Sequence, residues 1–215
     1  MQIFNHISDF LLGRPVRNIA SENKVIYLTF DDGPNSHCTP HVLALLKKHN
    51  AKATFFVITK HIAKNIEIFN RITNEGHSIG NHSPDHDTRF FIRGKSSLRK
   101  WIDYGEATIQ KQLGKASVGF RPPVGIRTPE LRQIMNEKNE YPIMWQHRFY
   151  DTKYAFLDSV WKKKFSKIRP GDIILLHDTH INPEKFLSSL ENFILQLIDN
   201  GFQLHAIPYK NPSQG

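Results

Sequence analysis

The sequence predicts a single α/β domain built on a parallel β-sheet or a (β/α) barrel. From about residue 24 onward, segments with the apolar pattern of strands alternate with segments patterned like amphipathic helices, which is typical of parallel strands joined by crossover helices. The chain has 215 residues, of which 39% are hydrophobic, so it is long enough for one large core. Titratable residues follow several of the predicted strands, where active sites of parallel α/β folds lie.

Seven segments are expected to form strands and six to form helices. The predicted strands cover residues 25–30, 53–58, 78–81, 117–121, 143–147, 172–177 and 203–207. The predicted helices lie between them, at about 39–49, 61–75, 96–113, 128–139, 155–168 and 184–200. Thr39 and Thr128 are predicted N-caps because each precedes a proline, which suits the first helical position. We expect an N-terminal arm at 1–22, one domain at 23–210 and a polar tail at 211–215.

The chain is basic, with a formal net charge of +9 and a pI near 9.6. Such a charge would suit nucleic acid or an anionic membrane surface. The lysines are scattered, however, and no basic run is interleaved with aromatic residues, which argues against a nucleic acid partner. The longest basic cluster, Trp161 to Lys164, is expected on the solvent face of a helix.

Neither the cysteine content nor the N-terminal segment points to an exported protein. Cys38 is the only cysteine, so no intrachain disulfide can form, and it is interpreted as a small residue near a helix start. The pattern allows a short amphipathic helix at residues 4–12, but no signal-peptide core and no membrane span fit there or elsewhere. We therefore predict a cytoplasmic protein without a transmembrane segment, whose oligomeric state the sequence does not reveal.

Two aspartates and two histidines suggest a metal site. Asp31 and Asp32 stand side by side after the first predicted strand, and His82 and His86 follow the third. Two histidines and a carboxylate suffice to hold a catalytic divalent ion with open positions, and a second carboxylate beside it could act as a base. The i, i+4 spacing lets both imidazoles reach one ion if the segment makes a helical turn. An acidic turn with surface histidines is the competing interpretation, which the combination of both motifs disfavours.

Further polar residues close other predicted strands. Arg121 ends the fourth strand and could hold a catalytic carboxylate in its ionised form. Asp151 follows the fifth strand, and His177 and Asp178 close the sixth. His177 is either a satisfied core group or an acid–base residue, and its place at a strand end favours the second role. Because parallel strands end at one face, these residues are expected to meet.

In order along the chain, five motifs resemble those of the polysaccharide deacetylases of carbohydrate esterase family 4, the NodB-homology domain. They are residues 29–34 (TFDDGP), 82–86 (HSPDH), 121–125 (RPPVG), Asp151 and 174–178 (ILLHD). The resemblance covers residues 24–206 and implies a distorted, incomplete (β/α) barrel with seven parallel strands. Residues 27–40 look most similar to the short chitooligosaccharide deacetylases, whose length is also similar.

The resemblance assigns a role to each motif. It implies Asp31 as the general base, paired with Arg121, and His177 as the general acid, supported by Asp151. It also implies a divalent metal, with Zn²⁺ expected first and Co²⁺, Mn²⁺ or Ni²⁺ as alternatives. The implied metal ligands are Asp32, His82 and His86.

The implied substrate-binding residues are Pro123, Val124 and Leu175. A backbone N–H near Pro123 and Val124 would hold the oxyanion, and Leu175 would form a wall of the acetyl pocket. The sequence also departs from the family pattern at three positions. Val124 stands where the family usually has Tyr or Phe, Thr152 where Trp is expected, and Arg148 where another acid often occurs. These departures affect substrate preference more than the reaction.

The resemblance thus implies a metal-dependent hydrolase that removes the N-acetyl group of N-acetylglucosamine-type units in a carbohydrate substrate. A deformylase or deacylase of a lipid-linked sugar is the nearest alternative, since a basic surface suits a phosphate-bearing carrier. A non-catalytic glycan-binding module on the same fold is the next, although a pure binder needs neither Asp31 nor His177.

Overall fold

Six strands form one parallel sheet in the described part of the chain, which in this computed structural model comprises residue 9 and residues 12–154, 158–181 and 183–209. The strand order is β3-β2-β1-β5-β4, and β6 lies beside the amino-terminal end of β1. The bounds are β1 (Val25–Asp31), β2 (Ala53–Val57), β3 (Ser78–Asn81), β4 (His147–Arg148), β5 (Ile173–His177) and β6 (Gln203–Leu204).

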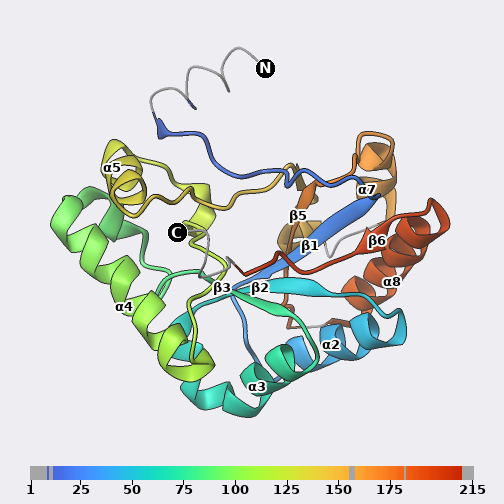
Figure 1. The fold of residues 1–215 in the computed structure, drawn as a ribbon. Helices are drawn as coiled ribbons and strands as arrows, with labels where there is room; N and C mark the ends of the chain where they lie inside the picture. Colours follow the sequence, from blue (N-terminus) through green and yellow to red (C-terminus); the bar gives the residue numbers. More distant parts are fainter. Residues whose placement is uncertain (1–8, 10–11, 155–157, 182, 210–215) are drawn as a thin grey trace.

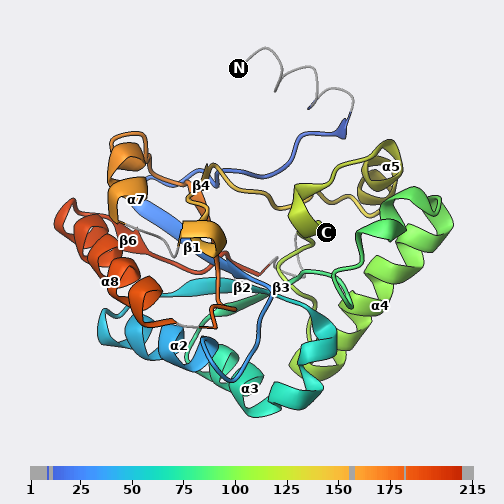
Figure 2. The same cartoon turned by 180° about the vertical axis from the view of Figure 1, so that it is seen from behind.

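Helices surround these strands on several sides, with α2 and α3 on one side, α7 and α8 on another, and α4 and α5 opposite (Figures 1 and 2). Their bounds are α2 (Thr39–Lys48), α3 (Ile66–Asn74), α4 (Lys95–Leu113), α5 (Pro129–Glu137), α6 (Asp151–Tyr154), α7 (Asp158–Phe165) and α8 (Pro183–Asp199). Short 3₁₀ turns cover Thr59–His61, Ala63–Asn65, Thr88–Ile92 and Pro123–Gly125.

The two faces of the central strand serve different purposes. Every residue of β1 is buried, and successive side chains point to opposite faces. Leu28 and Phe30 belong to the main hydrophobic cluster, together with Leu43 of α2 and Leu190 of α8. Thr29 and Asp31 therefore point to the other face, where the polar side chains of neighbouring strands lie. The main hydrophobic cluster thus stabilises the strand from one face, while the carboxyl end of its other face carries Thr29 and Asp31.

The predicted incomplete barrel is confirmed. The described residues form six strands rather than the seven expected. Residues 117–121 form only a bridge to β3, between Phe120 and Asn81, and of residues 143–147 only His147 belongs to a strand. For residues 143–147 the N-terminal arm gives the physical reason, because the backbone of Val16 hydrogen-bonds to Pro142 and Met144. Those groups are then unavailable for a regular ladder.

Several other predicted elements differ from the structure in their bounds or exposure. The predicted helix at 61–75 begins as two 3₁₀ turns before α3, and the helix at 155–168 is described only as α7, since residues 155–157 lie outside the described residues. Trp161 is buried, contrary to the expected solvent-facing cluster, whereas Lys162 and Lys163 are exposed. The predicted tail at 211–215, and nearly all of the predicted helix at 4–12, lie outside the described residues. The predicted domain boundary stays a prediction.

The start of α2 also differs from the prediction. Cys38, a buried small residue as expected, is the N-cap, and no side chain caps the helix. The Thr39 hydroxyl accepts a hydrogen bond from the backbone N–H of Asn35 (2.9 Å) and donates one to the carboxyl group of Asp178 (2.5 Å). Thr128, in contrast, caps α5 with its side-chain oxygen, as predicted.

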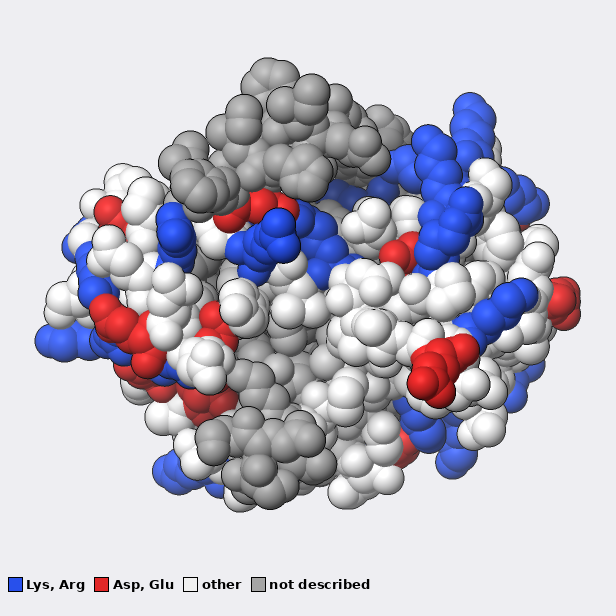
Figure 3. All heavy atoms as spheres, turned by 45° about the horizontal axis from the view of Figure 1, so that its top comes forward, with Lys and Arg blue, Asp and Glu red and all other residues white. Residues whose placement is uncertain are grey.

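The surface charge is distributed rather than concentrated. Figure 3 shows lysines and arginines in separate groups, with acidic side chains among them. This agrees with the scattered basic residues of the sequence. Within the described residues, no helix combines the length and apolar character needed to cross a membrane.

Candidate metal and catalytic site

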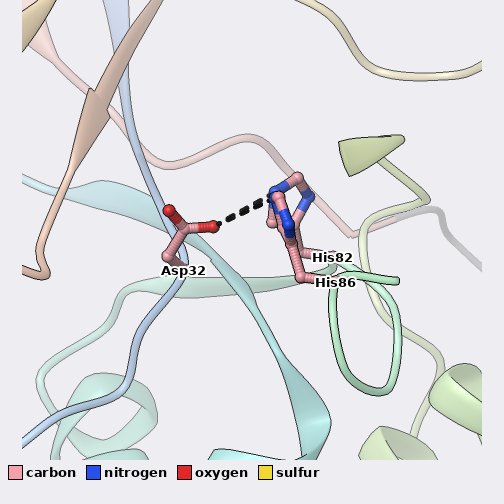
Figure 4. A group of neighbouring side chains, drawn as sticks. All are labelled: Asp32, His82 and His86. Atoms are coloured by element: carbon pink, nitrogen blue, oxygen red, sulfur yellow. Dashed lines mark ion pairs between the residues drawn. The ribbon is translucent and has the colours of Figure 1, made fainter. Parts of the chain in front are cut away.

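Loops at the carboxyl ends of β1 and β3 bring three potential metal ligands together (Figure 4). Oδ1 of Asp32 lies 3.4 Å from Nε2 of His82 and 3.6 Å from Nε2 of His86. One donor atom from each residue lies within 4.8 Å of the other two. The three side chains predicted from the sequence therefore form one cluster, with the donor types that suit a divalent ion such as zinc.

The surroundings of this cluster fit a bound cation. Nδ1 of His82 is 2.8 Å from the backbone carbonyl oxygen of Arg121. A bond donated there leaves Nε2 with a free lone pair, which is how metal-binding histidines are usually oriented. Oδ1 of Asp32 is buried and has no hydrogen-bond partner in the described structure. Burial opposes ionisation of Asp32, yet the nearby imidazole of His82 lowers its pKa. A buried, unpaired carboxylate oxygen facing two imidazoles is consistent with a metal site.

The backbone of the cluster is not the helical turn that the spacing suggested. Asp32, Ser83 and His86 have positive φ angles of 80°, 78° and 63°. The Ser83 side chain accepts a hydrogen bond from the backbone N–H of His86 (3.0 Å), which closes the loop. Left-handed backbone costs non-glycine residues about 1 kcal/mol or more each. Its concentration here indicates that the surrounding structure fixes the ligands in place.

The second aspartate of the pair, Asp31, is held by a buried arginine. Nη1 of Arg121 donates to Oδ1 of Asp31 and to the Thr29 hydroxyl, both at 2.7 Å. The guanidinium also donates to the backbone oxygens of Ile143 and Met144 and is fully buried. Burial lowers the pKa of Arg121 from its high ordinary value, while Asp31 opposes this effect. Arg121 thus presents a fixed cation to Asp31, as predicted.

A second buried carboxylate supports His177. Asp151 accepts a hydrogen bond from the backbone N–H of His177 (2.8 Å), and its Oδ1 lies 3.0 Å from Nδ1 of the same residue. Burial alone would lower the pKa of His177, but Asp151, aided by Asp31 and Asp32, raises it to about 9. Burial also opposes ionisation of Asp151, whose hydrogen bonds to His177 and His180 nevertheless lower its pKa to about 2. With Nδ1 engaged, Nε2 of His177 is available to give a proton.

Asp31 and His177 are neighbours in the sheet. Asp31 is the register partner of His177 in the β1–β5 pair, and register partners in parallel strands point to the same face. Nε2 of His82 lies 3.8 Å from Oδ2 of Asp31, so the metal cluster adjoins the pair. One face of the sheet therefore holds the carboxylate of Asp31, the imidazole of His177 and a candidate cation site.

The predicted substrate-binding residues lie in the 3₁₀ turn Pro123–Gly125 and in β5. Pro123 and Val124 form a 3₁₀ turn directly after Arg121, and Val124 is 62% exposed with a φ of 48°. Leu175 is buried and is the register partner of Thr29. It thus lies on the same face as Asp31 and His177. The positions are compatible with the predicted roles, which stay predictions.

Two groups near the site had no assigned role in the sequence analysis. His180 places Nε2 3.2 Å from Oδ2 of Asp151 and stacks on Phe186 at a ring distance of 4.0 Å. Asp178 is fully buried against the Gly33 backbone, and burial raises its pKa to about 7. A Cβ added to Gly33 would lie 2.3 Å from Oδ2 of Asp178. In the sequence, only the position of Asp178 directly after His177 indicated that it lies near the site.

Known proteins share this arrangement of sequence and fold. A family model described as polysaccharide deacetylase matches residues 18–141. A peptidoglycan-N-acetylglucosamine deacetylase of Listeria monocytogenes is 34% identical over 188 residues, which cover 87% of this chain and 39% of the relative. The chain thus spans about two fifths of that relative's length. A chitooligosaccharide deacetylase of Rhizobium leguminosarum bv. trifolii is 30% identical over 205 residues, covering 90% of this chain and 95% of the relative.

Solved structures agree with the sequence comparisons. The peptidoglycan N-acetylglucosamine deacetylase Bc1960 superposes with a TM-score of 0.81 at 29% identity, over 97% of this chain and 96% of that structure. A protein from Bacillus anthracis described as a pseudoenzyme of carbohydrate esterase family 4 superposes with a TM-score of 0.78 at 25% identity, over 90% and 67%. Because this fold is found in proteins described as active and as inactive, the argument for activity depends on the residues of the site.

Proposed function

Because the chain belongs to the polysaccharide deacetylase family, we propose that it hydrolyses the N-acetyl group of N-acetylglucosamine-type units in an oligosaccharide or polysaccharide, releasing acetate. The observation that carries this proposal is the meeting of the metal cluster with the Asp31–Arg121 and Asp151–His177 pairs on one face. A non-catalytic glycan-binding module would need neither a buried arginine on one carboxylate nor a buried carboxylate on a histidine.

Each side chain then has a defined task. A divalent ion held by Asp32, His82 and His86 would supply Lewis-acid chemistry that polarises a carbonyl and acidifies water. Asp31, held by its hydrogen bond from Arg121, accepts the proton of the attacking water. His177 donates a proton from Nε2 to the departing nitrogen, since an amine anion is a very poor leaving group.

The remaining residues position the acetyl group. A backbone N–H near Pro123 and Val124 holds the developing oxyanion, which is the usual function of such donors in acyl transfer. Leu175 bounds the acetyl methyl group on the face that carries Asp31. Asp151 orients the imidazole of His177 and stabilises its charged form.

For the metal we propose zinc, with cobalt, manganese or nickel as alternatives. Two imidazoles and one carboxylate with open positions match catalytic zinc sites. Metal analysis of the purified protein, followed by reconstitution of chelator-treated protein with each ion, distinguishes them. Highest acetate release per bound ion with manganese rather than zinc would replace this assignment.

Acetate release from a panel of substrates tests the proposed activity. The panel contains chitooligosaccharides, peptidoglycan fragments and lipid-linked N-acetyl sugars, each incubated with and without chelator. Asp31→Asn is the matched control, because the amide keeps the shape of the carboxylate and cannot accept the proton. Chelator-sensitive acetate release that is absent from Asp31→Asn supports the proposal, whereas no release from any substrate by metal-loaded protein contradicts it.

We further propose a preference for small glycans in the cytoplasm. Val124 and Thr152 are exposed where an aromatic side chain would provide a stacking surface, so long polymers have fewer contacts here. A soluble oligosaccharide should therefore give a higher kcat/KM per sugar than polymeric chitin. Cell fractionation tests the location, and recovery of the protein outside the cytoplasm would overturn that part.

A further inference from the structure

Two cationic side chains lie against the ring of one exposed tyrosine, which precedes a residue of the proposed acid–base pair. Tyr150 directly precedes Asp151 and is 46% exposed, with a φ of 56°. The guanidinium carbon of Arg148 lies 5.0 Å from the centre of its ring, and Nζ of Lys164 lies 5.2 Å from the same centre. Nζ of Lys164 also donates to the backbone oxygen of Arg148 (2.9 Å). Two positive charges are thus fixed around one aromatic ring.

These cations are unusual because no carboxylate neutralises them in the described structure. Most other buried or half-buried cations here have one, such as Arg17 with Asp9, and Arg121 with Asp31. No ion pair of Arg148 or Lys164 with an acidic side chain is found among the described residues, and Nε of Arg148 is buried without a hydrogen-bond partner. An unpaired donor of this kind is costly unless something binds it.

Arg148 also lies on the proposed substrate side of the sheet. Arg148 is the register partner of Leu175 in the β4–β5 pair, and Leu175 is the register partner of Thr29 in β1. Register partners share a face, so Arg148 lies on the face of Asp31 and His177. The chain then continues through Tyr150 to Asp151, which holds His177. Arg148 and Tyr150 therefore lie on the chain segment that leads directly into the residue that holds His177.

We propose that Arg148, Tyr150 and Lys164 form a subsite for a sugar that bears a carboxylate or phosphate and is joined to the N-acetylated unit. The inference rests on the proposed function. It narrows the substrate class to glycans that carry a negative charge beside the N-acetylated unit. The exposed tyrosine ring offers a stacking surface for the sugar. Arg148 offers a planar fork of donors that matches either anion, and Lys164 adds a point charge.

The test compares three short N-acetylated oligosaccharides of equal length: a neutral one, one with a carboxylate on the neighbouring sugar, and one with a phosphate there. Binding is measured by calorimetry on metal-loaded protein, and kcat/KM is measured from acetate release. The variants are Arg148→Gln and Lys164→Gln, with Lys163→Gln as the matched control. Lys163 is an exposed lysine of the same helix outside the proposed subsite.

Wild-type protein should bind the better anionic oligosaccharide about tenfold or more tightly than the neutral one, the scale expected of a charge-assisted hydrogen bond. Arg148→Gln should remove most of this preference, Lys164→Gln a part of it, and Lys163→Gln none. The two anionic ligands show whether carboxylate or phosphate is the better fit.

The outcomes separate the two proposals. Binding that favours an anion and depends on Arg148, without acetate release from any ligand, would reject the deacetylase function and keep the subsite. Equal binding of neutral and anionic ligands, or a preference that Arg148→Gln leaves intact, would overturn the subsite while acetate release still supports the deacetylase. Circular dichroism and thermal unfolding of each variant establish that the comparison is made on folded protein.

Discussion

Replacing Asp151 with asparagine tests how the structure prepares His177 as an acid. Asp151 is buried and accepts two hydrogen bonds from His177, one from the backbone and one from the imidazole. A pKa raised from 6.5 to about 9 corresponds to about 3 kcal/mol of stabilisation of the imidazolium. Asp151→Asn removes the carboxylate that raises the pKa of His177. Burial, which lowers that pKa, is then opposed much less.

The expected result is a pH–rate profile whose high-pH limb moves to lower pH. A general acid works only while protonated, so activity falls as pH rises through the pKa of His177. The variant should lose activity earlier on this limb and should be about 10² slower at neutral pH. Titration of the His177 imidazole by NMR measures the pKa directly in both proteins.

Stability should change with pH in a defined direction. The folded pKa of His177 is raised, so its contribution is fully present below about pH 6.5 and is lost as pH rises through about 9. The folded pKa of Asp151 is depressed to about 2, so its contribution is present above 3.8 and is lost as pH falls. The difference in unfolding free energy between wild type and Asp151→Asn should therefore be largest between about pH 4 and 6.5.

Asp103→Asn is a suitable control, because it removes a carboxylate of α4 whose partner is Lys138. It should leave the pH–rate profile unchanged. An unchanged high-pH limb in Asp151→Asn, with an unchanged pKa of His177, would refute the role given to this pair.

Three further changes have distinct expected outcomes. Asp31→Asn should bind metal with an affinity close to wild type yet lose at least about 10² in kcat, so that metal affinity falling together with turnover would contradict its role as base. His177→Ala should impair amide substrates far more than aryl acetates, whose leaving groups need no proton; equal losses on both would remove His177 as the acid. Gly33→Ala should lower the unfolding free energy by about 1–3 kcal/mol, because its Cβ would meet the Asp178 carboxyl at 2.3 Å; an unchanged melting temperature would show that Asp178 moves freely.

From the sequence, the positions at which the strands end could be predicted better than the extent of the strands themselves. Val25–Asp31 and Ile173–His177 are buried apolar runs, and such runs identify central parallel strands. Residues 143–147 carried a similar pattern, but their hydrogen-bond partners include Val16 of the N-terminal arm. Pairing with a distant segment leaves no local signal. The described residues therefore hold six strands rather than the seven predicted, and the incomplete barrel is confirmed.

In the site, too, features encoded by contiguous residues could be predicted, whereas contacts with distant segments could not. Asp32, His82 and His86 could be predicted because each motif is contiguous and follows a strand. The environments of His180 and Asp178 could not, since Phe186 and Thr39 come from other elements of the fold. The helical turn expected between His82 and His86 was also wrong, because positive φ angles in that loop arise from the tertiary structure.

Metal titration of chelator-treated protein tests the central claim most directly. Acetate release should be absent without metal and should rise linearly with added Zn²⁺ to a break at one ion per chain. His82→Ala should show no such break while keeping a cooperative unfolding transition, because a ligand at a strand end contributes little to the core. Full acetate release from protein shown by elemental analysis to be metal-free would contradict the account.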